Sequence, residues 1–547
     1  MTSSKHDIEV VVAIDFGTVS SGYAYANKSN PNEITVENKW DGFTGYKTPT
    51  IIKYDESYSS IRSWGFFALP ERPRKKRNAS DDNQSKPIEL FKLFLLKGNS
   101  SLPDKLDYKK VISDYLEKLG EMIKGRINTH WPSLDFYNQV LIVLTVPVEF
   151  DDDAIAIMRD CAFNAKLIKE RDSRYLLFIT EPEAAAIHCL NSSEKNKLKP
   201  GDSFMVVDCG GGTVNLTSHE LLENNKISEI TESTSGNCGS SLIDKKFIEF
   251  LGRKLGSSTI ESLEKNHYNI LQYMVQEFCK DVKIPFTGQK SEFQRYEIIL
   301  KNYPSVIEKA KEQGFLRESD SIWVEFNDVR GMFDPLIKKI IDLIKGQLAQ
   351  QPNKECSAIM LVGGFSESKY LQDRIKKEFN KIVSNISVPS QPMIAVAKGG
   401  AQFGLRTETT AYRVLRRTYG TDTIRRSLPG DPPSQILPNG YTIIFDALAG
   451  RGKPISVNEK VVREFKPHSI MQRSISFDLY VTKALNAKFC NDPGVSLLRP
   501  WEIELPENDN YEDITILFTL TFGAVEILAT AENQKTGEKY QVKVKYD

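Results

Sequence analysis

The stretch from Phe204 to Thr217 constrains this chain more than any other. An apolar run ends at Asp208, three glycines follow at 210–212, and a second β-like run begins after Thr213. Glycine has no Cβ, so this backbone can turn tightly and approach a ligand closely. Consecutive N–H groups in such a turn suit phosphate, and a carboxylate at the strand end can hold hydrated Mg²⁺ beside it. Taken alone, the stretch is equally typical of an ordinary hairpin with a glycine turn.

Two further segments repeat this chemistry. The run Val10–Ile14 leads into Asp15, a Gly-Thr turn and a return run in which small and aromatic residues alternate, as in a hairpin strand. A third run, Ala358–Val362, leads into two glycines and the helix-like stretch Ser366–Phe379. Such a unit aims backbone N–H groups and a helix N-terminus at a ligand. Together the segments predict a duplicated domain that holds one polyphosphate from opposite sides.

Length and composition limit the class of protein. A chain of 547 residues is too long for one core, so two or more domains are expected. Lysine plus arginine number 72, as do aspartate plus glutamate, so no net charge favours nucleic acid or an anionic membrane. Seven cysteines without a Cys-x-x-Cys pair suit a reducing compartment. Because the N-terminus is polar and no run approaches ~20 apolar residues, we expect a soluble, cytoplasmic protein without a membrane partner.

One short segment, Arg72–Arg77, is strongly basic. Such a run is typical of a nuclear import signal or a nucleic-acid patch, so a nuclear location stays open. Asp81 and Asp82 neutralise much of its charge, which favours a solvated loop. We therefore expect no nucleic-acid partner.

The remaining segments favour an α/β domain followed by a β-rich one. Apolar residues recur at helical spacing in Tyr108–Ile127, whereas Gln139–Val146 and Tyr175–Thr180 have the composition of buried strands. Between residues 236 and 350 the helices expected are Leu242–Leu255, Tyr268–Lys283 and Asp334–Leu348. After residue 405, turn signals separate short alternating runs, which predicts a β-sandwich whose edge strand can bind an extended peptide.

Three shorter motifs accompany the glycine turns: Leu144–Phe150, Thr180–Ala186 and Ala395–Ala401. With them, residues 8–405 resemble the nucleotide-binding domain of the 70-kDa heat-shock proteins, within the actin-like ATPase superfamily, and are most similar to the divergent heat shock 70 kDa protein 12 branch. The resemblance implies an α/β fold with a duplicated ribonuclease-H-like ATPase domain in two lobes over residues 1–405. It implies a β-sandwich-like substrate or partner domain over residues 406–547. The helical lid of typical members is not expected, because the chain stops at Asp547.

The resemblance also assigns roles in a site for ATP or ADP with Mg²⁺. Asp15 and Asp208 would hold the metal through water, and Glu181 would orient its shell or the attacking water. Lys92 stands where the family has its catalytic lysine, although its apolar surroundings are also typical of a surface lysine. The catalytic set is Lys92, Glu181, Asp208 and Thr213, and the nucleotide-binding set is Asp15, Gly17, Thr18, Val19, Ser20, Gly210, Gly211, Gly212, Thr213, Glu277, Lys280, Gly363 and Gly364.

Several positions depart from the family pattern. Those near the phosphates are Val19, Ser20, Asn215 and Ser240, and those near the adenine are Asp281, Glu367 and Met393. Asp281 and Glu367 stand where the family has the arginines that sandwich the base. Each lost guanidinium contact is worth roughly 0.5–2 kcal/mol. We therefore expect weaker or less adenine-specific nucleotide binding than in typical members.

Three functions are consistent with these residues. The first is an ATP-binding, slowly ATP-hydrolysing chaperone-like protein, with peptide or protein clients at the C-terminal β domain. The second is a nucleotide-binding scaffold or signalling protein with little or no hydrolysis. The third is a different enzyme on the same core, such as a sugar kinase, which the β-rich C-terminal part disfavours. The fold alone does not separate them, because function depends on the site.

Overall fold

The chain divides into two compact units in the computed structural model. The first unit comprises Met1–Glu149, Ile157–Thr217 and Ser233–Thr407, and the second comprises Phe150–Ala156, Ser218–Glu232 and Glu408–Asp547. The structure describes residues 8–71, 86–96, 102–103, 106–171, 173, 175–191, 198–223, 226–315, 321–351, 355–405, 410–415, 417–451, 454–456, 459–467, 472–484, 487–505, 514–522 and 526–545. The basic run Arg72–Arg77 therefore lies outside the described residues. Within the described ranges, no helix has the length and apolar character needed to cross a membrane.

One sheet of the first unit is built around β1 (Val10–Asp15). Its strand order is β11-β10-β1-β2-β3. β10 (Val140–Val146) runs parallel to β1, and β11 (Leu176–Thr180) runs parallel to β10. β2 (Ser20–Asn27) is antiparallel to β1, and β3 (Thr35–Val36) is antiparallel to β2. Every residue of β1 and β10 is buried, as expected for strands whose sequence is a continuous apolar run.

A second sheet of the same unit is built around β12 (Ser203–Cys209). Its order within the unit is β19-β18-β12-β13. β18 (Cys356–Val362) is parallel to β12, and β19 (Asn385–Ser387) is parallel to β18. β15 (Thr234–Gly236) pairs with the first half of β13 (Val214–Leu221). In both sheets, a strand with an aspartate near its end lies between a parallel neighbour and the strand that follows it in sequence.

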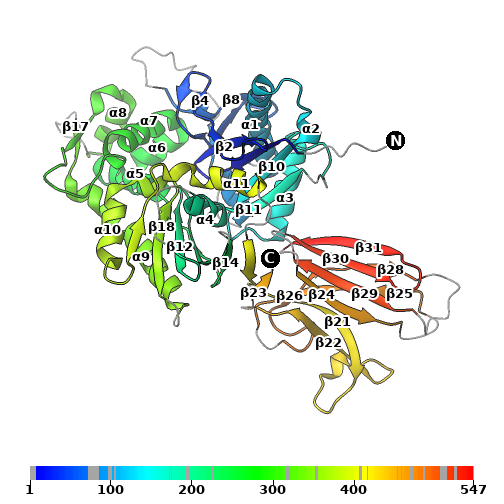
Figure 1. Cartoon of the computed structure of the whole chain (residues 1–547). Helices are drawn as coiled ribbons and strands as arrows, with labels where there is room; N and C mark the ends of the chain where they lie inside the picture. Colours follow the sequence, from blue (N-terminus) through cyan, green and yellow to red (C-terminus); the bar gives the residue numbers. More distant parts are fainter. Residues whose placement is uncertain are drawn as a thin grey trace. The chain divides into compact units, whose positions relative to one another are not determined.

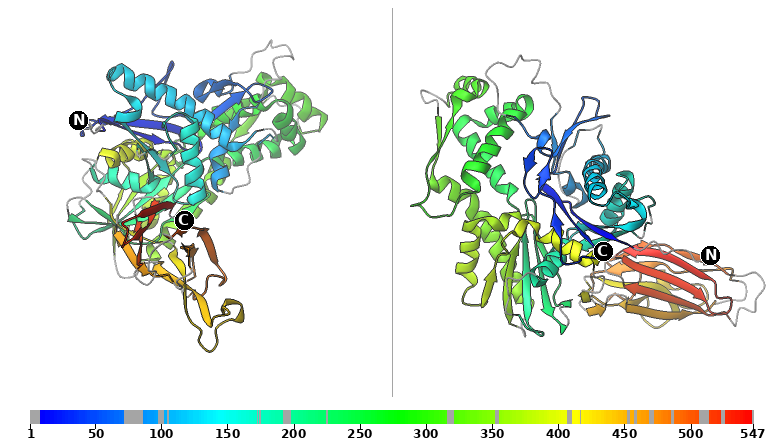
Figure 2. Two further views of the ribbon diagram at one scale, coloured as in Figure 1. Left: turned by 90° about the vertical axis from the view of Figure 1, so that its right-hand side faces the viewer. Right: turned by 45° about the horizontal axis from the view of Figure 1, so that its top comes forward.

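Two helices join the two halves of the first unit. α11 (Ala395–Leu405) packs against β1, β2, β10 and α4 (Glu181–Asn191), as Figures 1 and 2 show. A Cβ atom on Gly399 would lie only 1.6 Å from the carbonyl oxygen of Ala184, so the two helix backbones touch directly. Three further helices accompany the first half of the chain: α1 (Tyr108–His130), α2 (Phe136–Gln139) and α3 (Asp152–Asn164).

The second half of the unit is mostly helical. Its helices are α5 (Ser241–Leu255), α6 (Ser257–Asn266), α7 (Tyr268–Phe278), α8 (Pro304–Glu312), α9 (Phe326–Ala349) and α10 (Lys369–Phe379). They share an apolar core in which the rings of Phe247 and Phe278 stack at 4.0 Å between centroids. A two-stranded sheet, β16 (Tyr296–Ile299) with β17 (Ser321–Val324), adjoins this core.

The expected helices differ most from those observed at α9 and α7, and α10 begins at Lys369 rather than Ser366. α9 begins at Phe326 rather than Asp334, because Glu325 and Asp328 form a capping box at its start and Pro335 is accommodated within it. The helix expected over Tyr268–Lys283 is α helical only to Phe278 and continues as a π-helical turn over Cys279–Lys283.

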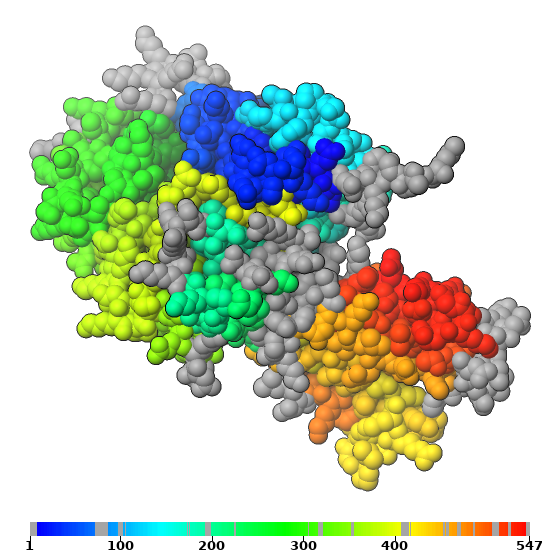
Figure 3. All heavy atoms as spheres, viewed as in Figure 1, coloured from blue at the N-terminus to red at the C-terminus, as the bar shows by residue number. Residues whose placement is uncertain are grey.

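Short strands surround the first hairpin. They are β4 (Lys39–Trp40), β5 (Phe43–Thr44), β6 (Thr48–Pro49), β7 (Ile51–Tyr54), β8 (Ile61–Trp64) and β9 (Ile88–Glu89). β6 pairs with β2, while β7 pairs with both β8 and β9. α1 contacts β7 and β8, and the space-filling view shows the early strands in blue beside α1 in cyan (Figure 3). A 3₁₀ turn, Phe91–Leu96, follows β9 and carries Lys92.

The second unit is rich in β-strands. Its larger sheets have the orders β22-β21-β26-β27 and β24-β29-β30-β31, and β25 pairs with β28. β14 (Ile227–Glu229) pairs with β20 (Thr410–Val414), which pairs with β23 (Pro454–Ser456). The other strands are β21 (Thr418–Arg426), β22 (Tyr441–Ala449), β24 (Glu459–Phe465), β25 (Ser474–Ser476), β26 (Leu479–Thr482), β27 (Val495–Arg499), β28 (Glu502–Glu504), β29 (Ile516–Phe522), β30 (Glu526–Asn533) and β31 (Lys539–Lys545). An apolar core includes the stacked pair Phe477 and Phe518.

The prediction of a mixed α/β protein with several sheets is confirmed. The proposed boundary between residues 405 and 406 stays a prediction. The compact second unit begins at Glu408 and also includes the two internal segments, 150–156 and 218–232.

Candidate functional site

The first glycine turn connects β1 to β2. Asp15 is the last residue of β1 and is only 3% exposed. A Cβ atom on Gly17 would lie 2.2 Å from the carbonyl oxygen of Ser20, so a tight turn of this shape requires glycine. The side chain of Thr50 bonds the carbonyl of Gly17 at 2.8 Å and fixes the turn from outside.

The second glycine turn connects β12 to β13. The backbone N–H groups of Gly239, Ser240 and Ser241 donate to the carbonyl oxygens of residues 212, 210 and 211, at 2.9–3.1 Å. Residues 239–241, which lead into α5, thus fix the positions of these carbonyl groups. They can do so because Gly239 has no side chain; a Cβ there would lie 2.4 Å from the carbonyl oxygen of Gly211.

The two turns are in contact. A Cβ atom on Gly211 would lie 2.5 Å from Val19 Cγ2, and one on Gly212 would lie 3.0 Å from Thr18 Cγ2. The absence of side chains on these glycines therefore allows the turns to approach each other. The third glycine segment joins them from β18, because Gly363 has a φ of 84° and a Cβ there would lie 2.3 Å from Asp208 Oδ1.

Two lysines and three carboxylates converge at these turns. Lys92 Nζ lies 2.6 Å from Glu181 Oε1, and the lysine side chain is 2% exposed. Lys47 Nζ lies 2.6 Å from Asp15 Oδ2, and its side chain is 15% exposed. Asp208 adds a third buried carboxylate. The amide of Asn215 lies beside this group, 3.4 Å from Glu181 Oε2.

These residues enclose one cavity of about 130 Å³. Its lining consists of Asp15, Gly17, Thr18, Val19, Ser20, Lys47, Lys92, Glu181, Asp208, Gly210, Gly211, Gly212, Thr213, Ser240, Gly363, Gly364, Phe365, Met393 and Val396. Ligand sites for whole small molecules usually measure about 300–1,000 Å³. The enclosed part therefore suits phosphate groups and a cation rather than a complete nucleotide.

Burial disfavours the ionised forms of the carboxylates in this cavity. Burial, and then the charges of Glu181 and Asp15, raise the pKa of Asp208 to about 8. Burial also raises the pKa of Glu181, although the Lys92 ammonium opposes it. Burial alone would lower the pKa of Lys47, but the charges of Asp15, Asp208 and Glu181 outweigh it and raise that pKa. The site therefore favours cations, because each added positive charge relieves the crowding of carboxylates.

The donor set is consistent with a hydrated metal. Among the described residues, no three His, Cys, Asp or Glu side chains are arranged so that they could ligate one metal ion together. A Mg²⁺ ion beside Asp15 and Asp208 would thus retain much of its water shell, as Mg²⁺ usually does in phosphate sites. Its chemistry there would be to neutralise phosphate oxygens.

The structure brings most of the expected site residues together. All of the catalytic set and all of the nucleotide set except Glu277 and Lys280 line the cavity. Glu277 lies on α7 and accepts hydrogen bonds from Tyr273 at 2.9 Å and Tyr303 at 3.5 Å, and Lys280 is exposed. The nucleotide role of these two residues stays a prediction.

Sequence reasoning missed one charged residue of the site. Lys47 was not singled out from the sequence, because its approach to Asp15 depends on how β6 pairs with β2. The available signal was its position directly before Thr-Pro-Thr, where a chain re-enters a strand. Phe365 and Val396 also line the cavity without having been singled out.

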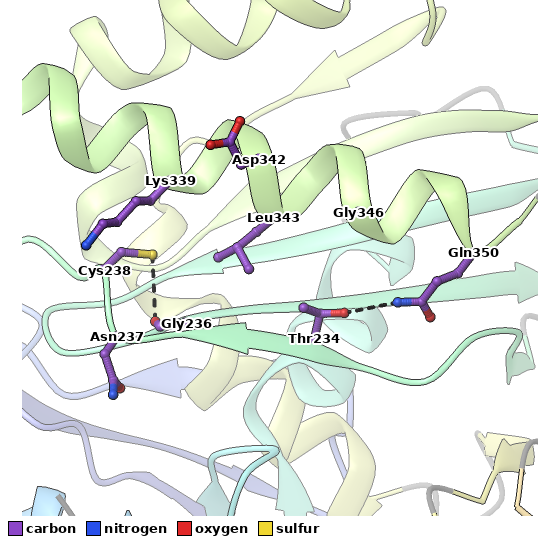
Figure 4. Close-up of a pocket in the computed structure, with 9 residues that line it drawn as sticks. All are labelled: Thr234, Gly236, Asn237, Cys238, Lys339, Asp342, Leu343, Gly346 and Gln350. Atoms are coloured by element: carbon purple, nitrogen blue, oxygen red, sulfur yellow. Dashed lines mark hydrogen bonds between the residues drawn. The ribbon is translucent and has the colours of Figure 1, made fainter. Parts of the chain in front are cut away.

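A separate groove of about 560 Å³ lies between α9 and the segment 234–238 (Figure 4). Leu343 points from the helix toward that segment, and the Cys238 thiol donates to the carbonyl of Gly236 at 3.7 Å. Lys339 and Asp342 are the charged residues of its lining. This groove does not include the glycine turns or the paired charges of the first cavity.

Comparison with known proteins identifies the relatives of this chain. A family model described as a domain of unknown function (DUF8340) matches residues 198–388. Heat shock 70 kDa protein 12B of Homo sapiens is 25% identical, over 98% of this chain and 91% of its own length. Heat shock 70 kDa protein 12A of Homo sapiens is 25% identical, over 100% and 92%. Chaperone protein DnaK of Mycoplasma mycoides is 24% identical, over 76% and 63%.

The chain is similar to members of the 70-kDa heat-shock protein superfamily. Its similarity to the heat shock 70 kDa protein 12 branch extends over nearly the whole chain, whereas the similarity to DnaK covers about three quarters of it. The cavity at the glycine turns is the place where the geometry of this chain suits phosphate groups.

Proposed function

We propose that this protein binds ATP at the cavity between its glycine turns, hydrolyses it slowly, and acts as a chaperone-like protein of the 70-kDa heat-shock type. The observation that carries the proposal is the convergence of three glycine segments from β1, β12 and β18 on two lysines and three carboxylates. Glycine turns supply backbone donors for phosphate, and lysines supply charge for it. The matching strand orders of the two sheets support a duplicated, two-lobed actin-like domain as the scaffold.

The residues of the cavity have distinct roles in this proposal. Lys92 pairs with Glu181 at 2.6 Å and stabilises charge on the γ-phosphate, and Glu181 orients the attacking water. Asp15 and Asp208 hold Mg²⁺ through its water shell. Thr18 and Thr213 offer hydroxyl groups to phosphate oxygens from the two turns. Phosphoryl transfer mainly requires positioning and neutralisation of charge, which these residues can provide.

A specific observation favours a second function, that of a nucleotide-binding scaffold with little or no hydrolysis. Asn215 lies 3.4 Å from Glu181, at a position where the resemblance leads us to expect an aspartate. A neutral amide cannot accept a proton from water as a carboxylate does. In this alternative, nucleotide occupancy itself is the signal, and the β-rich second unit serves as the surface for partners.

The clients and the location belong to the same proposal. An extended peptide would pair with an edge strand of the second unit, such as β22 or β24, through backbone hydrogen bonds. The cysteine content continues to favour the cytoplasm, which stays a prediction.

The test combines binding with a single turnover. Labelled ATP is titrated into the purified chain with Mg²⁺ and with EDTA, and phosphate release is then followed from the saturated complex. We expect saturable binding and slow release that Asp208→Asn abolishes without loss of fold by circular dichroism. Asp373→Asn, at an exposed position on α10, is the matched control. Absence of ATP binding would show the proposal to be wrong, whereas binding without release would leave the scaffold function.

A further inference from the structure

Lys47 is one of the residues that line the phosphate cavity. It directly precedes β6, whose Thr48 pairs in register with Ser21 of β2. The neighbouring Tyr46 accepts a hydrogen bond at 2.7 Å from Gln391 Nε2, a residue next to the segment that carries Met393. Lys47 is thus held from both sides, while its own side chain retains 15% exposure.

A glycine gives the Lys47 side chain its route to the site. Gly22 is opposite Asp15 in the register of β1 and β2. A Cβ atom on Gly22 would lie 2.7 Å from the carbonyl oxygen of Tyr46 and 3.0 Å from Lys47 Cγ. The bare backbone at Gly22 therefore lets the lysine cross β2 and place its ammonium 2.6 Å from Asp15 Oδ2.

This ammonium changes the charge that the cavity presents. Three carboxylates and two ammonium groups give the cavity a formal charge of minus one. Of the two ammonium groups, that of Lys92 already forms an ion pair with Glu181. Lys47 therefore neutralises the carboxylate that the resemblance assigns to the metal. A lysine ammonium is a compact point charge on a flexible stem, and phosphate is among its usual partners. It can bind a phosphate oxygen from the position where it now binds Asp15.

We propose that Lys47 is an internal counter-ion of the phosphate site and that it makes nucleotide binding largely independent of Mg²⁺. The inference rests on the proposed nucleotide-binding function and specifies how that site neutralises its ligand. The ion pair of 2.6 Å supports it, because Asp15 already has a cation beside it before any ligand enters.

The competing mechanism is displacement. The four-carbon stem of Lys47 could turn outward when metal and nucleotide enter, since the side chain retains some exposure to solvent. Binding would then require Mg²⁺, and Lys47 would act only as a placeholder. The two mechanisms predict opposite effects of Lys47 on the metal dependence of binding.

The experiment measures the affinity for ATP in excess Mg²⁺ and in EDTA for the wild type, Lys47→Met and Lys39→Met. Lys39, on β4, is exposed and serves as the control for removing a nearby lysine. We expect the affinity of the wild type and of Lys39→Met to change less than about threefold between the two conditions. We expect Lys47→Met to lose about thirtyfold in EDTA, the scale of one charge-assisted contact, and to recover most of it in Mg²⁺.

Two further measurements test the role of Lys47 without relying on nucleotide turnover. In melts with Mg²⁺ alone, Lys47→Met should gain a stabilising shift that the wild type lacks, because its cavity becomes more negative. Gly22→Ala keeps every charge but blocks the route of Lys47, so it should reproduce the metal dependence of Lys47→Met. Wild-type metal independence in Gly22→Ala would contradict the proposed route.

The outcomes separate this inference from the function on which it rests. If wild type and Lys47→Met both lose more than about tenfold in EDTA, Lys47 is displaced and the inference is wrong, while nucleotide binding stands. If the wild type binds no ATP in either condition, the proposed function fails and the inference fails with it.

Discussion

The carboxylate of Glu89 accepts a hydrogen bond from the phenol of Tyr268, a residue 179 positions further along the chain. Glu89 ends β9, and the next residue, Leu90, adopts a left-handed backbone with a φ of 59° before the turn that carries Lys92. Lys86 Nζ lies 5.5 Å from the centre of the Tyr268 ring. The segment that positions Lys92 is therefore attached to α7 in the helical half of the unit.

Removing this phenol should destabilise the protein. In Tyr268→Phe the partly buried Glu89 carboxylate loses its donor, a change that typically costs about 1–3 kcal/mol. Urea unfolding would measure the loss. Tyr273→Phe is the comparison, because Tyr273 donates at 2.9 Å to Glu277 within the same helix, where solvent can replace the bond more readily. Equal stability of the two variants would argue against a structural role for the Glu89–Tyr268 contact.

The same contact predicts how stability depends on pH. Burial raises the pKa of Glu89, Asp244 adds to this effect, and the hydrogen bond from Tyr268 opposes it. Between the unfolded pKa of about 4.3 and the higher folded value, the native state binds more protons, so its stability falls as pH rises through that window. Glu89→Gln removes the titration. Its stability relative to the wild type should therefore increase from pH 4 upward, and parallel curves would contradict the assignment.

Two adjacent glycines should respond differently to the same substitution. Gly363→Ala places a Cβ 2.3 Å from Asp208 Oδ1 at a φ of 84°, and the phosphate site should lose its shape. Gly364→Ala meets no atom within 4 Å and should be tolerated. We expect nucleotide affinity to fall at least about tenfold in the first variant only. Matching affinities for both would mean that Asp208 is free to move aside.

Much of the site could be predicted because its parts are local in sequence. Each glycine turn lies beside the strand that positions it, so Asp15, Asp208 and the glycines were recognisable from short motifs. Lys47 was not recognisable, because its place depends on the pairing of β6 with β2 and on the missing side chain of Gly22. Tyr268 was missed for the same reason, since its partner lies far away in the chain.

For the fold as well, features that depend on neighbouring residues were predictable from the sequence, whereas contacts between distant segments were not. Apolar runs located the buried strands β1, β10 and β12, because the burial of each strand follows from its own residues. It could not show that β14 pairs with β20, since Ile227 and Thr410 become neighbours only in the folded chain. One helix start was displaced because α9 begins at the capping box of Glu325 and Asp328, and its buried apolar repeat starts at Val329.

Base selectivity is a further measurable property. Asp281 and Glu367 are both exposed and neither lines the enclosed cavity, so the base should contribute little to affinity. ATP and GTP should differ by less than about tenfold, or ~1.4 kcal/mol. Replacing both residues by arginine should tighten ATP selectively through stacking on the purine. Calorimetry on the parent and the double variant decides it, and a strong ATP preference in the parent would count against this view.

The proposed boundary can be tested with two fragments. Residues 1–405 and 406–547 should each melt cooperatively. The second should melt at a lower temperature than in the intact chain, because it lacks β14, the partner of β20, and Glu232, which pairs with Arg451 at 2.8 Å. Adding residues 218–232 by fusion should recover part of the difference. A molten 406–547 fragment would mean that the two internal segments are essential to this unit.

The contact of Gly399 with the carbonyl of Ala184 also has a mechanical meaning. Packed backbones deform little, so a displacement of α11 along its axis would also move α4. α4 begins at Glu181, in the wall of the phosphate cavity, and α11 ends at Leu405, just before the chain continues into the second unit. A pull on the connecting chain would therefore act on Glu181, the residue that pairs with Lys92. The rigidity of the α11–α4 contact would then determine how strongly a force on the chain affects the phosphate cavity.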